Sequence, residues 1–334
     1  MHATIGRLQL MALHDPEQFL RSGRDQIELA IPVFKRLNDP RGLAKSWYLL
    51  AYLGWTGGQL TRAGAAAERA RAFAREAKDT YWEATILGLH CLILYWGPVH
   101  LDEVEVRNRE ALAEAEKSGV RSLKAAALMV LARIAAMRGN FDEARGLVRS
   151  ANSITEDLGE SLTRATNCIS QALIELLDDE LGAAEATLLQ GYQMLEQMEI
   201  TGPRSSVAGM LSRVLLLQGR NDEAEKMART CEQIAATDQL DAQIKWRGIR
   251  AIVLARRGEV EQAEKLAREA VSLADRTDQL DSRAEAHGDL AEVLRSADRG
   301  GEAVRELKRA IWLYSEKGNE VAERNARRLL EVIP

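Results

Sequence analysis

The sequence predicts an all-α protein built as a right-handed α-solenoid of about seven helix pairs. Three observations predict it: the amino-acid composition, a recurring turn phrase, and small residues at fixed distances from that phrase. The 334 residues include only six Pro and four Phe and are rich in Ala, Leu, Glu and Arg. Such a mixture combines strong helix formers with few helix breakers or strand formers, which gives the all-α class.

The turn phrase reads Gly-polar-apolar-acidic-Glu/Gln-Ala and sets the period of the solenoid. It is clear at 139–144, 219–224 and 258–263, looser at 58–63, 179–184 and 298–303, and degraded at 99–104. Its last positions fall at 63, 104, 144, 184, 224, 263 and 303, so the step is near 40 residues. Gly closes a helix C-terminus cheaply, and acidic residues suit the start of the next helix. Each phrase therefore predicts the turn inside a helix pair.

Small residues mark the seam between the two helices of each pair. Seven positions after the phrase stand Ala70, Ala111, Ala151, Gly191, Cys231, Ala270 and Ala310. Seven before it stand Ala51, Leu92, Ala132, Ala172, Ser212, Ala251 and Ala291. Small side chains on one helical stripe allow two helices to approach closely. Enlarging one is expected to overpack the seam at a cost of about 1–3 kcal/mol.

The joint between consecutive pairs has its own signature. The pentapeptide Thr-Asp-Gln-Leu-Asp occurs at 237–241 and again at 277–281, one period later. Leu240 and Leu280 begin new apolar faces, and Asp238 and Asp278 are predicted to cap the helices that follow.

We expect one continuous domain over residues 1–334, because no Pro/Gly/Ser-rich linker divides the chain. Within it, residues 1–40 are predicted to form N-terminal capping helices and residues 41–318 the repeats. Residues 319–334 are predicted to form a C-terminal capping helix with a polar outer face, as a solenoid requires at its ends.

Charge and cysteine content limit the classes of binding partner and the cellular compartment that the sequence predicts. The formal charge is −5 and no block of five or more Lys/Arg occurs, so direct binding to nucleic acid is not expected. No apolar run reaches the length of a membrane span, and the N-terminus lacks the features of a secretory signal. Cys91, Cys168 and Cys231 lie far apart in apolar contexts, which predicts reduced, buried thiols and a cytoplasmic location.

The turn phrase and the flanking small residues resemble the tetratricopeptide repeat, a helix–turn–helix unit of 34 residues. Three stretches, 31–44, 93–98 and 242–258, also resemble the C-terminal repeat region of bacterial signalling proteins that join a nucleotide cyclase, a regulatory ATPase and a repeat tail. The resemblance implies a regulatory role and partner domains of ATPase or cyclase type. The phosphate-binding Gly-x-x-x-x-Gly-Lys-Ser/Thr loop is absent from this sequence. The chain is therefore interpreted as such a tail or a free-standing relative.

No pattern of catalytic chemistry is found, so neither enzymatic activity nor a metal or cofactor is expected. His90 and His100 have no second His at helical metal-ligand spacing. The acidic cluster Asp178-Asp179-Glu180 is similar to that of terpene synthases but falls in a predicted turn, where such residues cap the next helix. A toroidal α/α enzyme with convergent carboxylates remains an alternative. It requires contact between the first and last helices around acidic residues.

Aromatic residues are unevenly distributed: eight of the twelve Trp and Tyr lie between positions 47 and 96. One helical register predicts a concave binding groove lined by Tyr48, Tyr52, Trp55, Leu89, Ile93, Trp96, Met129 and Arg133. The corresponding C-terminal positions Glu285, Gly288, Glu292 and Arg295 are small or charged. The alternative is that the aromatics fill space between repeats. We predict a non-enzymatic module that binds a peptide or protein, with a small-molecule or signal-peptide sensor as the alternative.

Overall fold

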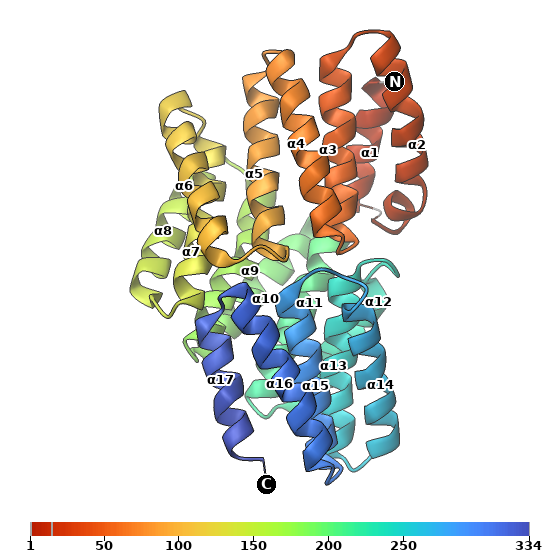
Figure 1. Ribbon diagram of the computed structural model, residues 1–334, viewed down its shortest axis with the longest axis vertical. Coiled ribbons are helices and arrows are strands. Elements are labelled where there is room, and N and C mark those ends of the chain that lie inside the picture. The colour runs from red at the N-terminus through yellow and green to blue at the C-terminus, as the bar shows by residue number, and fades with distance from the viewer. Residues whose placement is uncertain (1, 15, 334) are drawn as a thin grey trace.

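The structure is a computed structural model that describes residues 2–14 and 16–333. Over these residues it contains 17 α-helices and no strand, which confirms the predicted all-α solenoid (Figure 1). Two helices, α1 (His2–His14) and α2 (Pro16–Arg36), precede the repeats, and α17 (Glu320–Glu331) follows them. The seven pairs are α3 (Pro40–Thr56) with α4 (Leu60–Glu76), α5 (Thr80–Trp96) with α6 (Leu101–Ser118), α7 (Arg121–Met137) with α8 (Phe141–Asp157), α9 (Ser161–Leu177) with α10 (Leu181–Gln197), α11 (Thr201–Leu217) with α12 (Asn221–Ile234), α13 (Leu240–Arg256) with α14 (Val260–Ala274), and α15 (Leu280–Ser296) with α16 (Gly300–Lys317).

The first helices of the pairs form the inner wall of the curve. Each of them, from α3 to α13, touches the first helix of the next pair, whereas over the described residues the second helices make no comparable contacts with each other. Neighbouring elements lie closer together on the inside of a curved stack than on its outside. The odd-numbered helices therefore line the concave side and the even-numbered helices the convex side.

The seams inside the pairs are built as predicted from small residues. Ala70, Ala151 and Ala270 are fully buried. A Cβ atom added at Gly191 would overlap the Cys168 side chain of the facing helix. Packing this tight tolerates no added volume.

The turns inside the pairs also follow the phrase. Gly139 and Gly219 adopt φ values of 86° and 78°, and Asp179 and Asp298 take the same left-handed conformation where the phrase lacks Gly. The exception is the degraded turn at residues 97–100, which has four residues instead of three, with a φ of −77° at Gly97. The least regular turn of the sequence is thus also the least regular turn of the fold.

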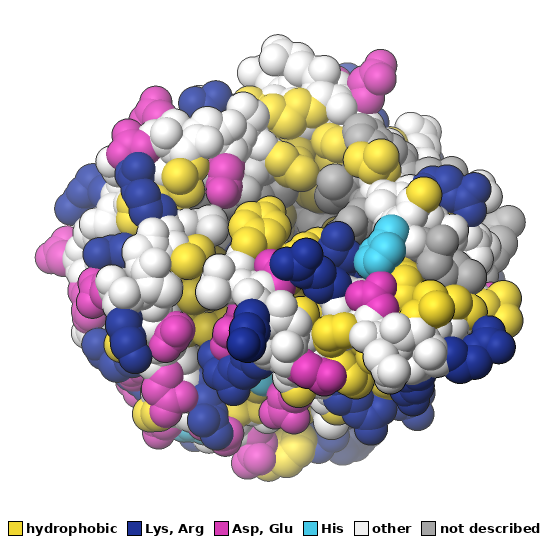
Figure 2. All heavy atoms as spheres, turned by 90° about the horizontal axis from the view of Figure 1, so that it is seen from above, with side chains coloured by type: hydrophobic (Ala, Val, Ile, Leu, Met, Phe, Trp, Pro, Cys, Tyr) yellow, Lys and Arg dark blue, Asp and Glu magenta, His cyan; other side chains and the backbone are white. Residues whose placement is uncertain are grey.

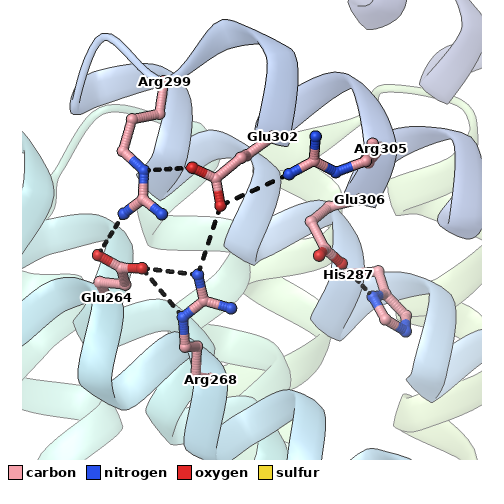
Figure 3. Close-up of polar contacts among 7 residues, drawn as sticks. All are labelled: Glu264, Arg268, His287, Arg299, Glu302, Arg305 and Glu306. Carbon is pink, nitrogen blue, oxygen red and sulfur yellow. Dashed lines mark hydrogen bonds and ion pairs between the residues drawn. The ribbon is translucent and has the colours of Figure 1, made fainter.

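Salt bridges on the convex side connect each pair to the next. Glu264, the fifth residue of α14, accepts a hydrogen bond of 2.6 Å from Arg299 in the next turn (Figure 3). On α8 the same position carries Arg145, and the next turn supplies Asp178, so the pair is reversed in polarity. The corresponding pairs elsewhere are Glu105–Arg138, Glu185–Arg220 and Glu225–Arg257. Since α4 has Gly64 at this position, the first two pairs lack such a bridge.

The predicted helix caps at the two Thr-Asp-Gln-Leu-Asp joints are wrong. The residues at the N-caps of α13 and α15 are Gln239 and Gln279, and neither side chain makes a capping hydrogen bond. The joints themselves lie where predicted, between α12 and α13 and between α14 and α15. The carboxylate of Asp278 caps a different helix, which is far away in the sequence.

The solenoid turns back on itself. In Figure 1, helices α1–α5 form one end of the molecule and α11–α17 the other, with α7–α10 connecting them. Helix α1 contacts α11, and α17 contacts α7. No helix within the described residues is both long enough and apolar enough to cross a membrane.

Candidate functional site

A first interlock joins the two ends of the solenoid: residues 58–61 contact residues 276–278. The Asp278 carboxylate accepts hydrogen bonds of 2.7 Å from the backbone N–H groups of Leu60 and Thr61. The Gln59 side chain donates to the carbonyl of Arg276 at 2.9 Å. Because the first N–H groups of a helix have no partner inside it, Asp278 acts as the cap of α4 from more than 200 residues away.

A second interlock lies at the degraded turn, where residues 97–100 meet residues 317–319. The ammonium group of Lys317 is completely buried and donates to the carbonyls of Gly97 at 2.8 Å and Val99 at 3.0 Å. It also lies 5.6 Å from the centre of the Tyr95 ring. Burial lowers the pKa of Lys317 to about 8, against the attraction of Asp281. A Cβ atom at Gly318 would overlap the ring of His100.

The two interlocks bring the ends of the solenoid together around an inner hollow, which is called the inner channel below. Viewed from the end formed by the N-terminal helices, the molecule is hollowed near its centre, and hydrophobic and basic side chains gather around the hollow (Figure 2). The odd-numbered helices supply the wall because they line the concave side. The candidate functional site is this channel.

The wall contributed by α11, α13 and α15 is charged. Arg213 makes a double hydrogen bond of 2.7 Å with Asp289, which lies two pairs further along the chain. Gly248 on α13 makes this possible, because a side chain there would overlap the Asp289 carboxylate. Burial alone lowers the pKa of Arg213, but the carboxylate of Asp289 raises it overall.

Two further carboxylates on α15 face this wall. Burial raises the pKa of both Asp281 and Glu285, while the nearby charge of Lys245 opposes that rise. Asp281 accepts a hydrogen bond of 2.9 Å from Asn319. Burial also raises the pKa of Tyr314, and the same carboxylates add to the effect. This part of the wall therefore carries acidic and basic groups that are largely withdrawn from solvent.

Helix α3 carries the aromatic residues predicted to line the groove. The Tyr52 and Trp55 rings lie 5.4 Å apart in an edge-to-face arrangement, and Tyr48 packs on Trp82 of α5 at 5.2 Å. Tyr48, Tyr52 and Trp55 are all half-buried. Burial raises the pKa of Tyr48 to about 12. These side chains combine contact with the core and residual exposed surface.

Other residues of the predicted groove lie in the core instead. Leu89 and Ile93 pack among the alanines of α3 and α4, and Met129 packs against α8. All three are buried, with Ile93 only 1% exposed. The helical register predicted which residues share a face, but in α5 and α7 part of that face is covered by the neighbouring pair. In this structure these three side chains do not line an open groove.

Trp96 and Arg133, also predicted groove residues, lie close together. The Arg133 guanidinium is stacked near the rings of Tyr95 and Trp96, with its central carbon 5.1 and 5.2 Å from their centres. Its Nε donates to the Ser170 hydroxyl of α9 at 2.8 Å. Trp96 is half-buried, whereas Arg133 is only 6% exposed.

The convex side carries two separate hollows next to α6. A shallow hollow of about 630 Å³ has Leu112, Leu128 and Ile154 at its base. A smaller one of about 260 Å³ is bordered by the Glu105–Arg138 bridge. Both are lined largely by residues of the even-numbered, convex helices and include none of the interlock residues.

A toroidal arrangement is not formed. The described part of α1 contacts α11, not the last helix α17. The enclosed carboxylates Asp281, Glu285 and Asp289 come from the single helix α15 and face basic groups. Among the described residues, no group of three or more His, Cys, Asp or Glu side chains is arranged to hold a metal ion.

Comparisons with known proteins show the fold. No family model and no curated protein matches the sequence. Among solved structures, a Rap protein complexed with Competence and Sporulation Factor is similar over 98% of this chain and 83% of its own, with 13% identity and a TM-score of 0.62. A tetratricopeptide repeat protein from Parabacteroides merdae covers 86% and 97% of the two chains, with 14% identity and a TM-score of 0.45. The chain therefore shares its overall helical fold with the Rap protein, and its consecutive helix pairs form the predicted repeats.

Sequence reasoning missed the residues that close the channel. Lys317 is the last residue of the regular helix α16, where a basic residue is ordinary, and gives no signal of burial. Asp278 is predicted as a local helix cap, like its copy Asp238 in the other joint. The one available signal was the degraded phrase at 99–104, since a turn that departs from its repeat is a place where another part of the chain can bind.

Proposed function

We propose that this chain is a non-enzymatic interaction module whose inner channel binds a peptide or a segment of a partner protein. The observation that carries the proposal is the enclosed channel with an aromatic wall on α3 and a charged wall on α11, α13 and α15. An extended peptide presents apolar side chains together with backbone and charged groups, so it can satisfy both walls at once.

The similar fold of the Rap protein complexed with Competence and Sporulation Factor supports this proposal, since it shows that a related superhelix can hold a partner factor. Repeats that contact only their neighbours produce one continuous concave surface, which suits an extended ligand.

The proposed cellular role is regulatory. The stretches 31–44, 93–98 and 242–258 resemble the repeat tail of bacterial cyclase and ATPase signalling proteins. On this basis the partner is an ATPase or cyclase domain of the same or another polypeptide in the cytoplasm. Ligand binding in the channel would then control that domain.

A small-molecule or signal-peptide sensor is the second reading, and the interlocks favour it over an open scaffold. Two contacts between the ends of the solenoid enclose the channel, which suits a short ligand more than a long one. The sensor hypothesis differs from the interaction-module hypothesis mainly in the length of the ligand.

The test uses the full chain and a displayed library of random peptides with free C-termini. Peptides selected by the unmodified chain are measured against the double variant Tyr52→Ala/Trp55→Ala, with Trp312→Ala on the convex side of α16 as the matched control. We expect binding to the double variant to weaken about tenfold or more, with the helical circular dichroism signal retained, and binding to the control to be unchanged. A large fall in melting temperature with unchanged affinity would show that these aromatics are core residues only.

A further inference from the structure

Arg133 is a buried cation with no anionic partner. Among the described residues no carboxylate lies within ion-pair distance of its guanidinium, and its Nη1 has no hydrogen-bond partner at all. Its contacts are the neutral hydroxyl of Ser170 and the faces of Tyr95 and Trp96. Burial lowers the pKa of Arg133, as expected for a charge held without compensation. Buried charges in proteins are normally paired or bind a ligand.

The solenoid contains an internal reference for this residue. Arg133 is the thirteenth residue of α7, and Arg213 is the thirteenth residue of α11. The two positions are equivalent in the repeat, so both guanidinium groups point to the concave side. Arg213 is satisfied by two hydrogen bonds from its guanidinium to Asp289, the tenth residue of α15. The same site of the repeat is thus paired in one place and unpaired in the other.

Arg133 has no carboxylate at the position equivalent to Asp289. The tenth residue of α11, which is equivalent to Asp289, is Met210. The ninth residue of the intervening helix is Gly248 in the paired case but Ile169 in α9. A Cβ atom at Gly248 would overlap the Asp289 carboxylate. At the equivalent position, the larger Ile169 therefore leaves no room for a carboxylate to approach in the same way.

We propose that Arg133 receives a carboxylate of the ligand that enters the inner channel. This inference rests on the proposed function and specifies the chemistry of the ligand: a peptide with an Asp or Glu side chain, or its free C-terminus, at this point. The Ser170 hydroxyl and the unpartnered Nη1 supply polar contacts, and the Trp96 face lies beside an apolar neighbouring side chain of the ligand. A guanidinium binds a carboxylate with two parallel hydrogen bonds, which fixes the ligand's register as well as its affinity.

The test measures matched peptides that differ only in charge. Each peptide selected by the unmodified chain is compared with its Asp→Asn or Glu→Gln form and with its C-terminal amide. We expect one of these changes to weaken binding about tenfold or more, as for a charge-assisted hydrogen bond removed from a buried site. The side-chain and amide arms show which carboxylate is bound. Equal binding of all matched pairs would overturn the inference while leaving peptide binding itself intact.

Two variants locate the effect at Arg133. In Arg133→Met the unmodified and neutralised peptides should bind equally, whereas Arg164→Met, at an exposed arginine of α9, should preserve the discrimination. In Ser170→Asp, the tenth residue of α9 supplies an internal carboxylate next to the guanidinium. We expect this variant to lose the discrimination while its melting temperature stays equal or rises.

Each outcome decides between the proposals. If Arg133→Met does not fold, Ser170→Asp alone carries the test, because retained discrimination there contradicts the inference. Retained discrimination in a folded Arg133→Met contradicts it as well. If the unmodified chain selects no peptide, the proposed function fails, which is a different result from peptide binding without charge preference.

Discussion

Residues 237–241 and 277–281 have the same sequence and both connect one helix pair to the next, yet their surroundings differ. Thr237 and Asp238 are exposed, and no side-chain hydrogen bond of either is formed with the described residues. Thr277 is buried, and the carboxylate of Asp278 caps α4 at the opposite end of the solenoid. The same Thr-Asp pair is thus exposed to solvent in one joint and forms half of an interlock in the other.

The residues before the pentapeptide account for part of this difference. Ala235 leaves α12 in an extended conformation with ψ 128°, whereas Asp275 continues the helical conformation after α14 with ψ −14°. The backbone therefore enters the two copies of the pentapeptide in different directions. Only the second brings its Thr and Asp to the turn between α3 and α4.

The position along the superhelix accounts for the rest. At the turn around Gly58, Thr277 of the α14–α15 joint is the nearest neighbour, whereas Leu240 of the α12–α13 joint lies further away. Local sequence places a joint between pairs. Which surface that joint meets depends on the curvature accumulated over the intervening pairs.

Replacing the Thr of each joint by Arg should give the largest difference in stability between the two joints. In Thr277→Arg a long charged side chain replaces one whose methyl group lies against Gly58, where even a Cβ atom would be crowded. We expect the free energy of unfolding to fall by about 3 kcal/mol. Thr237→Arg should change it by less than about 0.5 kcal/mol, because the position is exposed. Urea unfolding of both variants provides the measurement, and equal effects would show that the first interlock does not form.

The sequence predicted the local features of the fold because they have local causes. The left-handed turn at Gly139 and the close helix contact at Gly191 require residues without bulk, and those residues recur at the period of the repeat. The same reasoning predicted the face shared by Tyr52, Ile93 and Arg133. It did not predict that Ile93 is covered by the preceding pair.

Long-range contacts left almost no local trace. Lys317 looks like a favourable basic residue at the end of α16, and its burial depends on two carbonyl groups about 220 residues earlier. The unpaired state of Arg133 depends on which residues later pairs place beside it, and Arg213 differs in having Asp289 as its partner. The channel residues follow from the tertiary structure, whereas the helix pairs follow from the period.

The second interlock should differ from the first in its response to pH. The pKa of Lys317 is about 8 in the folded protein and 10.5 for an ordinary lysine, so between these values the unfolded chain binds more protons. Stability therefore rises with pH in this window, by about 1 kcal/mol per pH unit and about 2 kcal/mol between pH 7.5 and 9.5. Urea unfolding at pH 7.5, 8.5 and 9.5 tests this. The rise should be larger in the unmodified chain than in Lys317→Met, and parallel pH dependences would indicate that Lys317 is not buried.

Removing only the carboxylate from each joint gives the smallest and most specific comparison. Asp278→Ala deprives the N–H groups of Leu60 and Thr61 of their acceptor and should lower the free energy of unfolding by about 1 kcal/mol, as for the loss of a helix cap. Asp238→Ala should have almost no effect, since its carboxylate is exposed. Hydrogen exchange sharpens the comparison, because the amides of Leu60 and Thr61 should exchange faster in Asp278→Ala and at the original rate in Asp238→Ala. If both amides stay protected in Asp278→Ala, the cap of α4 must come from within its own pair, and the joint would merely lie beside it.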